Sequence, residues 1–184
     1  MMRELSLNVL DIAQNSISAN ASLIEIEIIG DTRKNELLIG IYDNGKGMTS
    51  EQVRNVQDPF FTTRTTRKVG MGIPLFKMAA EQTGGSLSIE SEVGVGTKVK
   101  ALFKTDSIDY TPLGDIDSTI IMLITMNTDR NFIYRLKVDE KEFTLSTSEL
   151  KGILGDVPLN EPSVTQWIKE YLHEQTQTIR GGVL

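Results

Sequence analysis

Polar residues form a narrow stripe along the first segment of the chain when residues 4–19 are drawn as a helix. At about 100° per residue the stripe is only about 80° wide, and apolar residues such as Val9, Leu10 and Ile17 fill the opposite face. A surface helix usually has a broader polar face. We therefore predict a mostly buried helix that presents to a cavity the polar side chains of Glu4, Asn8, Asp11, Asn15 and Ser18.

The next residues show the patterns of strands and further helices. Isoleucines alternate with glutamates over 23–29, which is typical of a half-exposed strand. Thr49 and Gln52 have the spacing of a capping box at the start of a short helix over 50–56. The other expected elements are strands over 37–42, 86–91 and 97–104, a loop over 57–71 and a helix over 73–83.

The last part of the chain follows a stretch rich in Asp, Ser, Thr, Pro and Gly, which indicates a linker. Beyond it, 119–126 and 132–138 are expected to pair as a hairpin, and 146–154 and 163–175 to form helices. We thus expect an α/β domain over residues 1–106, a linker over 107–118 and a small C-terminal α/β domain over 119–184, whose role no motif indicates. A partner-binding face is the alternative to simple packing for Trp167, Ile168, Tyr171 and Leu172.

The composition of the chain excludes disulfides and several kinds of metal site. The chain has no cysteine and a single histidine, His173, which excludes disulfides, cysteine-ligated metals and histidine-cluster metal sites. The net charge of −6 argues mildly against nucleic acid as the main partner. No stretch approaches the roughly 20 apolar residues of a membrane span, and no secretion signal is visible at the start. We expect a soluble, cytoplasmic protein with no membrane partner.

Asp11 and Asn15 are the first candidates for chemistry. They are four residues apart, so they share one face of the predicted helix. An amide oxygen suits Mg²⁺, which keeps several waters and takes few protein ligands, and a carboxylate one turn away can orient a water. A buried polar pair that bonds the neighbouring backbone is the alternative, and the pair alone favours it.

The second candidate is the run Asp43-Asn44-Gly45-Lys46-Gly47-Met48, which follows a strand. An aspartate at a strand end can accept a hydrogen bond from an exocyclic amino group. Glycines beside it let a flat base approach the backbone. A plain glycine turn is the alternative.

Two further segments have features of a phosphate site. The run from Asp58 to Arg64 has paired phenylalanines, hydroxyls and a cation, with Arg67 and Lys68 close behind, and it fits a mobile flap or a solvated basic loop. Gly70-Met71-Gly72 opens a helix, whose first N–H groups bind phosphates. The chain has no G-x-x-x-x-G-K-[ST] motif, which excludes a Walker-type site.

Taken in order, these motifs resemble the GHKL ATPase superfamily of gyrase B, the heat-shock chaperone, histidine kinases and MutL. The resemblance covers about residues 4–104 and is most similar to the catalytic, ATP-binding domain of sensor histidine kinases; residues 11–22 also resemble MutL. It rests on Asp11 and Asn15, residues 43–47, Asp58 to Thr63, Gly70 to Ile73, Gly84-Gly85 and Gly94 to Thr97.

The resemblance implies the Bergerat fold, a two-layer α/β sandwich with helices on one face of a mixed sheet, and ATP with Mg²⁺ as ligands. It implies that Asn15 coordinates Mg²⁺ and that Asp43 reads the adenine amino group with help from Thr97. Gly45, Gly47 and Met48 are implied to line the base pocket. The phosphates are implied to meet Gly70, Met71 and Gly72, and the ATP lid to contain Thr62, Thr63, Arg64 and Lys68.

Departures from the family pattern leave the reaction open. Hydrolytic members usually have glutamate as general base where this chain has Asp11, whose shorter side chain reaches less far. Lys68 replaces a frequent glycine, and no phosphoacceptor helix precedes residue 4. We expect a stand-alone kinase-like protein in signal transduction that transfers the γ-phosphate to a separate protein partner. A slow ATPase switch and a non-catalytic nucleotide sensor are the alternatives, and a homodimer is left open. His173 is expected to be a surface residue rather than the phosphoacceptor.

Overall fold

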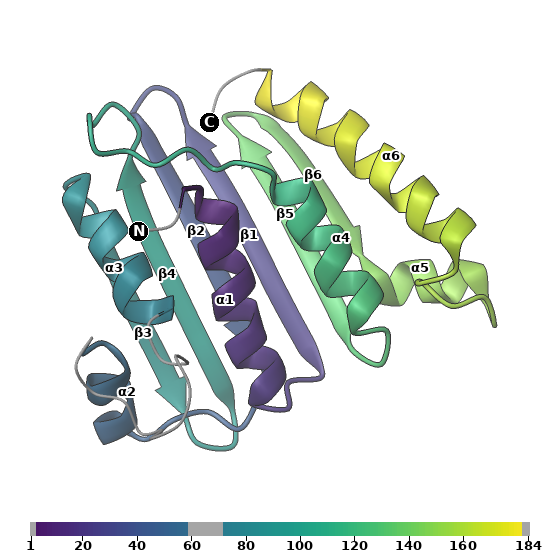
Figure 1. Ribbon diagram of the computed structural model, residues 1–184, viewed down its shortest axis with the longest axis horizontal. Coiled ribbons are helices and arrows are strands. Elements are labelled where there is room, and N and C mark those ends of the chain that lie inside the picture. The colour runs from purple at the N-terminus through teal and green to yellow at the C-terminus, as the bar shows by residue number, and fades with distance from the viewer. Residues whose placement is uncertain (1–2, 59–71, 182–184) are drawn as a thin grey trace.

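The computed structural model describes residues 3–58 and 72–181. Within this part of the chain, six strands form one mixed sheet in the order β3-β4-β2-β1-β5-β6, and α1, α3, α4 and α6 cover one face of it (Figure 1). The expected two-layer α/β class with helices on one face is confirmed. The strands are β1 (Leu23–Asp31), β2 (Glu36–Asp43), β3 (Ser86–Glu92), β4 (Gly96–Lys104), β5 (Asn131–Val138) and β6 (Lys141–Ser146). The helices are α1 (Leu5–Ser18), α2 (Ser50–Val56), α3 (Gly72–Gln82), α4 (Ile116–Met126), α5 (Thr147–Leu154) and α6 (Pro162–Arg180).

The strands alternate between the helix layer and the opposite side of the sheet, which we call the open face. On β1, Ile24, Ile26 and Ile28 are buried against the helices, while Glu25 and Glu27 are half-buried on the open face. This period of two is the one that the sequence pattern predicts. Neighbouring strands are antiparallel, except that β1 and β5 run parallel.

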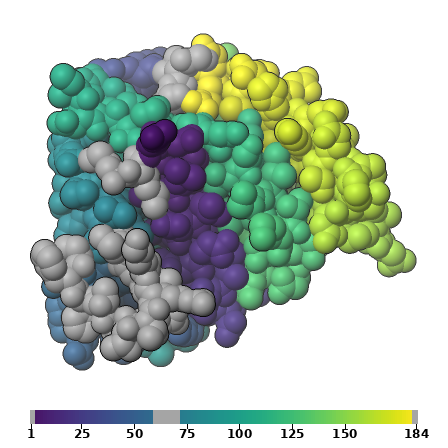
Figure 2. Space-filling view, viewed as in Figure 1, coloured from purple at the N-terminus to yellow at the C-terminus, as the bar shows by residue number. Residues whose placement is uncertain are grey.

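Helix α1 is less buried than predicted, since seven of its 14 residues are buried. Leu5, Val9 and Ala13 are fully buried, and the helix packs between α3 and α4. Its outer side reaches the surface beside α4 (Figure 2). The predicted polar stripe lies partly on this outer side, since Asp11 is half-buried and Asn15 is exposed.

The helices and strands expected within residues 1–106 are present to within two residues at each end, whereas the expected loop over 57–71 lies almost entirely outside the described residues. The capping box is also present at the start of α2. Thr49 Oγ1 accepts a hydrogen bond from the Gln52 N–H at 3.2 Å, and Gln52 Oε1 accepts one from the Thr49 N–H at 2.9 Å. Local patterns in this part of the chain therefore predict local structure well.

The prediction of a hairpin formed by 119–126 and 132–138 is wrong. Residues 116–126 form α4, whose first turn is capped by Asp115, with Oδ1 accepting from the Ser118 N–H at 3.0 Å. The apolar positions Ile116, Ile120 and Leu123 recur at helical spacing and are buried. This periodicity overrides the strand preference of a segment rich in Ile and Thr. The hairpin is instead formed by β5 and β6, joined through Asp139 at φ 53°.

The C-terminal segment does not stand apart from the first 106 residues, since β5 pairs with β1 and continues the same sheet. The expected linker is held against the start of α1 by hydrogen bonds. The Leu5 N–H donates to the Pro112 carbonyl at 2.9 Å, and the Asp115 N–H donates to Glu4 Oε2 at 2.7 Å. The expected boundary near residue 106 thus falls inside one continuous core.

Helix α6 covers β5 and β6. Ile168 and Leu172 are buried, which confirms their predicted packing role, while Trp167 is 50% exposed and stacks on Tyr171 with ring centroids 5.2 Å apart. His173 is exposed, and its Nδ1 lies 3.9 Å from Asp117 Oδ2. None of the helices within residues 3–58 and 72–181 is long and apolar enough to cross a membrane.

Candidate functional site

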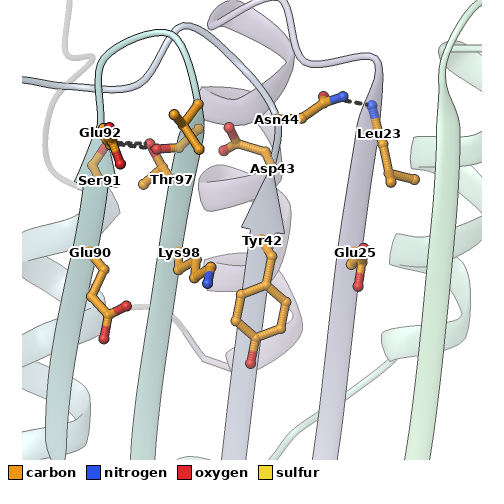
Figure 3. A pocket seen from close by; sticks show the side chains of 12 residues that line it. Leu23, Glu25, Tyr42, Asp43, Asn44, Glu90, Ser91, Glu92, Thr97 and Lys98 are labelled. Carbon is orange, nitrogen blue, oxygen red and sulfur yellow. Dashed lines mark hydrogen bonds between the residues drawn. The ribbon is translucent and has the colours of Figure 1, made fainter.

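Three polar side chains meet in one row across the ends of neighbouring strands. Asp43 on β2 is paired in register with Thr97 on β4, and Thr97 is paired with Ser91 on β3. The buried Ile24 continues the row on β1, so the row faces the helix layer. The antiparallel register therefore brings together two residues that are far apart in sequence and that were predicted to act together, Asp43 and Thr97 (Figure 3).

The carboxylate of Asp43 is held from two sides. Its Oδ1 accepts a hydrogen bond from the Gly45 N–H at 2.9 Å, and its Oδ2 accepts one from the Ser16 hydroxyl at 2.6 Å. Ser16 belongs to α1 and is buried, so the carboxylate points toward the helix layer and not toward the open face. The sequence motifs did not assign a role to Ser16, although it directly follows Asn15.

Close packing explains the glycines after Asp43, in addition to the predicted approach of a flat base. A Cβ added to Gly45 would lie 2.8 Å from the Ala19 carbonyl oxygen. Gly47 has φ 66°, which disfavours other residues, and an added Cβ would overlap the Glu92 carbonyl. The turn that follows Asp43 therefore packs closely between the end of α1 and the β3–β4 turn. That Gly45, Gly47 and Met48 line a base pocket stays a prediction.

Ser91 is a second residue that the sequence analysis missed. Its Oγ accepts a hydrogen bond from the Met48 N–H at 2.8 Å, donates to the Gly96 carbonyl at 3.0 Å and lies 2.9 Å from Thr97 Oγ1. When the Ser91 hydroxyl donates to the Gly96 carbonyl, the Thr97 hydroxyl is the donor in the hydrogen bond between Ser91 and Thr97. Ser91 and Thr97 flank the turn between β3 and β4, and the register of this hairpin places them opposite each other.

Asp11 lies against the start of α3. A Cβ added to Gly72, the first residue of that helix, would be 3.3 Å from Asp11 Cβ and 3.7 Å from Asp11 Oδ2. Burial raises the pKa of Asp11 above its ordinary value. Asn15 lies one helical turn further along the same face. The structure thus places Asp11 beside the end of α3 that was predicted to meet phosphates, while the same role for Asn15 stays a prediction.

A metal ion at this position would have few protein ligands. Among residues 3–58 and 72–181, no group of three or more histidine or acidic side chains forms a metal cluster. Mg²⁺ fits such a sparse donor set, because it keeps water and takes phosphate oxygens as further ligands. The Asn15 amide oxygen and the nearby Asp11 carboxylate are the right donor types for it. The metal role of Asn15 stays a prediction.

Six predicted site residues lie outside the residues that the structure describes. They are the lid residues and the first part of the glycine motif: Thr62, Thr63, Arg64, Lys68, Gly70 and Met71.

A hollow of about 410 Å³ lies next to the Asp43 row but belongs mainly to the open face. Figure 3 shows it lined by side chains that alternate with the row, among them Glu25, Tyr42, Glu90 and Lys98. Glu25, Glu90 and Glu92 outnumber its single lysine, Lys98, so the hollow repels a polyphosphate. The helix side of the row carries Ser16 beside Asp43, and Asp11 lies against the start of α3.

A family model described as histidine kinase-, DNA gyrase B-, and HSP90-like ATPase matches residues 1–107. A putative sensor protein of Shewanella frigidimarina is 28% identical over 103 residues, which are 55% of this chain and 15% of that protein. Sensor histidine kinase YvrG of Bacillus subtilis is 28% identical over 94 residues, 49% of this chain and 16% of the kinase. Sensor protein SrrB of Staphylococcus aureus is 40% identical over 78 residues, 40% of this chain and 13% of SrrB. The chain therefore spans less than a fifth of the length of these relatives.

Two solved structures share the fold. The N-terminal domain of a DNA repair protein superposes with a TM-score of 0.56 at 17% identity, over 79% of this chain and 53% of that one. The Aquifex aeolicus MutL ATPase domain complexed with ADP gives a TM-score of 0.50 at 20% identity, over 83% of this chain and 67% of that one. Both superpositions cover more than residues 1–107, so the likeness of fold extends into the C-terminal segment.

Proposed function

Since this chain belongs to the histidine kinase-, DNA gyrase B-, and HSP90-like ATPase family, we propose that it binds ATP between α1 and the ends of β2 and β4. The observation that carries this proposal is the row of Asp43 and Thr97, which is held by Ser16 and Ser91 on the helix side of the sheet. The adenine amino group donates to the Asp43 carboxylate, and Thr97 supports the same edge of the base. The ADP in the MutL ATPase structure supports a nucleotide as the ligand of this fold.

The triphosphate is proposed to extend from the base toward Asp11, Asn15 and the start of α3. Helix N-termini bind anions through free N–H groups and the helix dipole. Asn15 supplies an amide oxygen to Mg²⁺, which neutralises phosphate charge next to the Asp11 carboxylate. The lid residues Thr62, Thr63, Arg64 and Lys68 are proposed to supply further hydroxyl and cationic contacts, and Gly70 and Met71 to meet the phosphates with Gly72.

Asn15→Ala tests the metal contact. We expect ATP affinity to fall at least about tenfold with Mg²⁺ present, because a metal ligand is lost, and to change little when the metal is chelated. Calorimetric titrations with and without Mg²⁺ measure both values. Gln177→Ala removes an exposed amide from α6 and is the matched control. Equal losses with and without the metal would remove Asn15 from the metal site.

We propose that the γ-phosphoryl group passes from bound ATP to a nucleophilic side chain of a protein partner, leaving ADP. The relatives that are named sensor histidine kinases support transfer over hydrolysis. The short Asp11 side chain supports it too, because hydrolysis requires a base that reaches an attacking water, whereas a partner can bring its own. The alternative is a slow ATPase whose lid movement controls partner binding. It is favoured by the raised pKa of Asp11, because burial makes this carboxylate a stronger base than an exposed aspartate.

Incubation with γ-labelled ATP and Mg²⁺ separates these reactions, with Asp11→Asn as the decisive variant. For the transferase we expect label on an added acceptor protein and little free phosphate, which Asp11→Asn leaves unchanged. Free phosphate that falls at least about 100-fold in Asp11→Asn would instead identify a hydrolase with Asp11 as base. ATP binding with neither product would leave a nucleotide sensor and contradict both reactions.

A further inference from the structure

We infer that Ser16 is a positioning residue for the base-reading carboxylate, and that it sets the preference of the site for an adenine amino group. This inference rests on the proposed nucleotide function, which assigns the base contact to Asp43. Ser16 does not itself touch the base. It acts through its hydroxyl, which donates to Asp43 Oδ2 at 2.6 Å.

The bond between Ser16 and Asp43 joins the two layers of the fold. Ser16 lies on α1 and Asp43 ends β2, and the two residues are 27 apart in sequence. Ser16 is only 3% exposed, so its hydroxyl depends on a protein partner where water has little access. The geometry gives this hydroxyl a buried acceptor, and it gives the carboxylate a donor fixed to a rigid helix.

The two protein donors together define how Asp43 is oriented. The Gly45 N–H holds Oδ1 from the turn, and the Ser16 hydroxyl holds Oδ2 from the helix. A carboxylate has about four lone-pair sites, so two remain for a ligand, in directions that the protein donors determine. The terminal torsion of aspartate is broad and only loosely restrained by itself. Without Ser16, the carboxylate would keep the Gly45 bond but lose the contact that stops it from rotating.

The orientation matters for base choice, because the 6-position of a purine carries either a donor or an acceptor. Adenine presents an amino group, which a well-placed carboxylate accepts from. Hypoxanthine presents a carbonyl oxygen at the same position, which a fixed carboxylate repels. A carboxylate free to rotate would bind the amino group less well and would repel the carbonyl less. Loss of Ser16 is therefore expected to reduce discrimination between the two bases.

Ser16→Ala in the full chain tests the inference, with ATP and inosine triphosphate titrated in parallel by calorimetry. We expect ATP affinity to fall about tenfold, the size of effect for losing a hydrogen bond to a charged group, with inosine triphosphate affinity unchanged or slightly higher. The ratio of the affinity for ATP to the affinity for inosine triphosphate should therefore fall about tenfold. Ser6→Ala is the matched control, since Ser6 is likewise buried on α1 but its hydroxyl donates to Glu4 Oε2. It should leave both affinities unchanged.

The outcomes separate this inference from the proposal on which it rests. A wild-type chain that does not bind ATP, or that binds the two nucleotides equally, would overturn the role of Asp43 itself. A wild-type preference for ATP that Ser16→Ala leaves intact would overturn the role of Ser16 alone. Equal losses for both nucleotides in Ser16→Ala would show a general structural effect and also overturn it. Ser16→Cys, which keeps a weak donor, should restore part of the preference if the donor is what matters.

Discussion

Asp43→Asn is expected to abolish ATP binding, with a loss of at least about 100-fold in affinity. The substitution keeps the shape of the side chain but leaves one acceptor oxygen where there were two. Ser16 and the Gly45 N–H both donate to this side chain, so one of them must face the new NH₂ group or give way. In either arrangement a donor replaces one of the two oxygens that could accept from the amino group of the base.

Calorimetric titration with ATP measures this loss, and thermal unfolding checks that the variant folds. Asp106→Asn removes the same charge from an exposed position after β4 and is expected to bind ATP like the wild type. If the Asp43→Asn variant binds ATP with an affinity close to that of the wild type, Asp43 is not the base reader. The inference about Ser16 is then wrong as well.

Ending the chain after residue 106 is expected to prevent stable folding, even though the family match ends near that point. The truncated chain would lose β5, which pairs with β1 from Leu23 to Gly30, and α4, which packs against α1. It would also lose the carbonyls of Pro112 and Leu113, which accept from the first N–H groups of α1. Exposing each large apolar side chain lowers the free energy of unfolding by about 1.5–3 kcal/mol. Several such losses exceed the total stability of a domain, which is about 5–15 kcal/mol.

Circular dichroism and thermal melting of residues 1–106 test this expectation, which predicts no cooperative transition. A chain that ends at Gly181 retains every element that the structure describes and should melt like the full chain. Cooperative unfolding of residues 1–106, together with ATP binding, would show instead that the first 106 residues are an independent domain and that α4 to α6 are an addition to it.

The family and most of the local structure are readable from the order of the residues. The resemblance to the GHKL superfamily is confirmed by the family match over residues 1–107. The alternation of Ile and Glu in β1 and the pair of Thr49 and Gln52 at α2 are confirmed too. These features are readable because each depends on residues within a few positions of one another, where the period of a strand or the geometry of a cap leaves a local pattern.

Which distant segments meet is visible only in the folded chain. The β-branched residues in 119–126 led to the prediction of a strand, whereas the segment forms α4 and buries Ile120 and Leu123, which recur at helical spacing. The pairing of β5 with β1 made the C-terminal segment part of the same sheet. Likewise, Ser16 reaches Asp43, 27 residues further along the chain, through the packing of α1 against the sheet. Such contacts leave no periodic trace in the chain, because they depend on how whole elements are placed and not on the spacing of neighbouring residues.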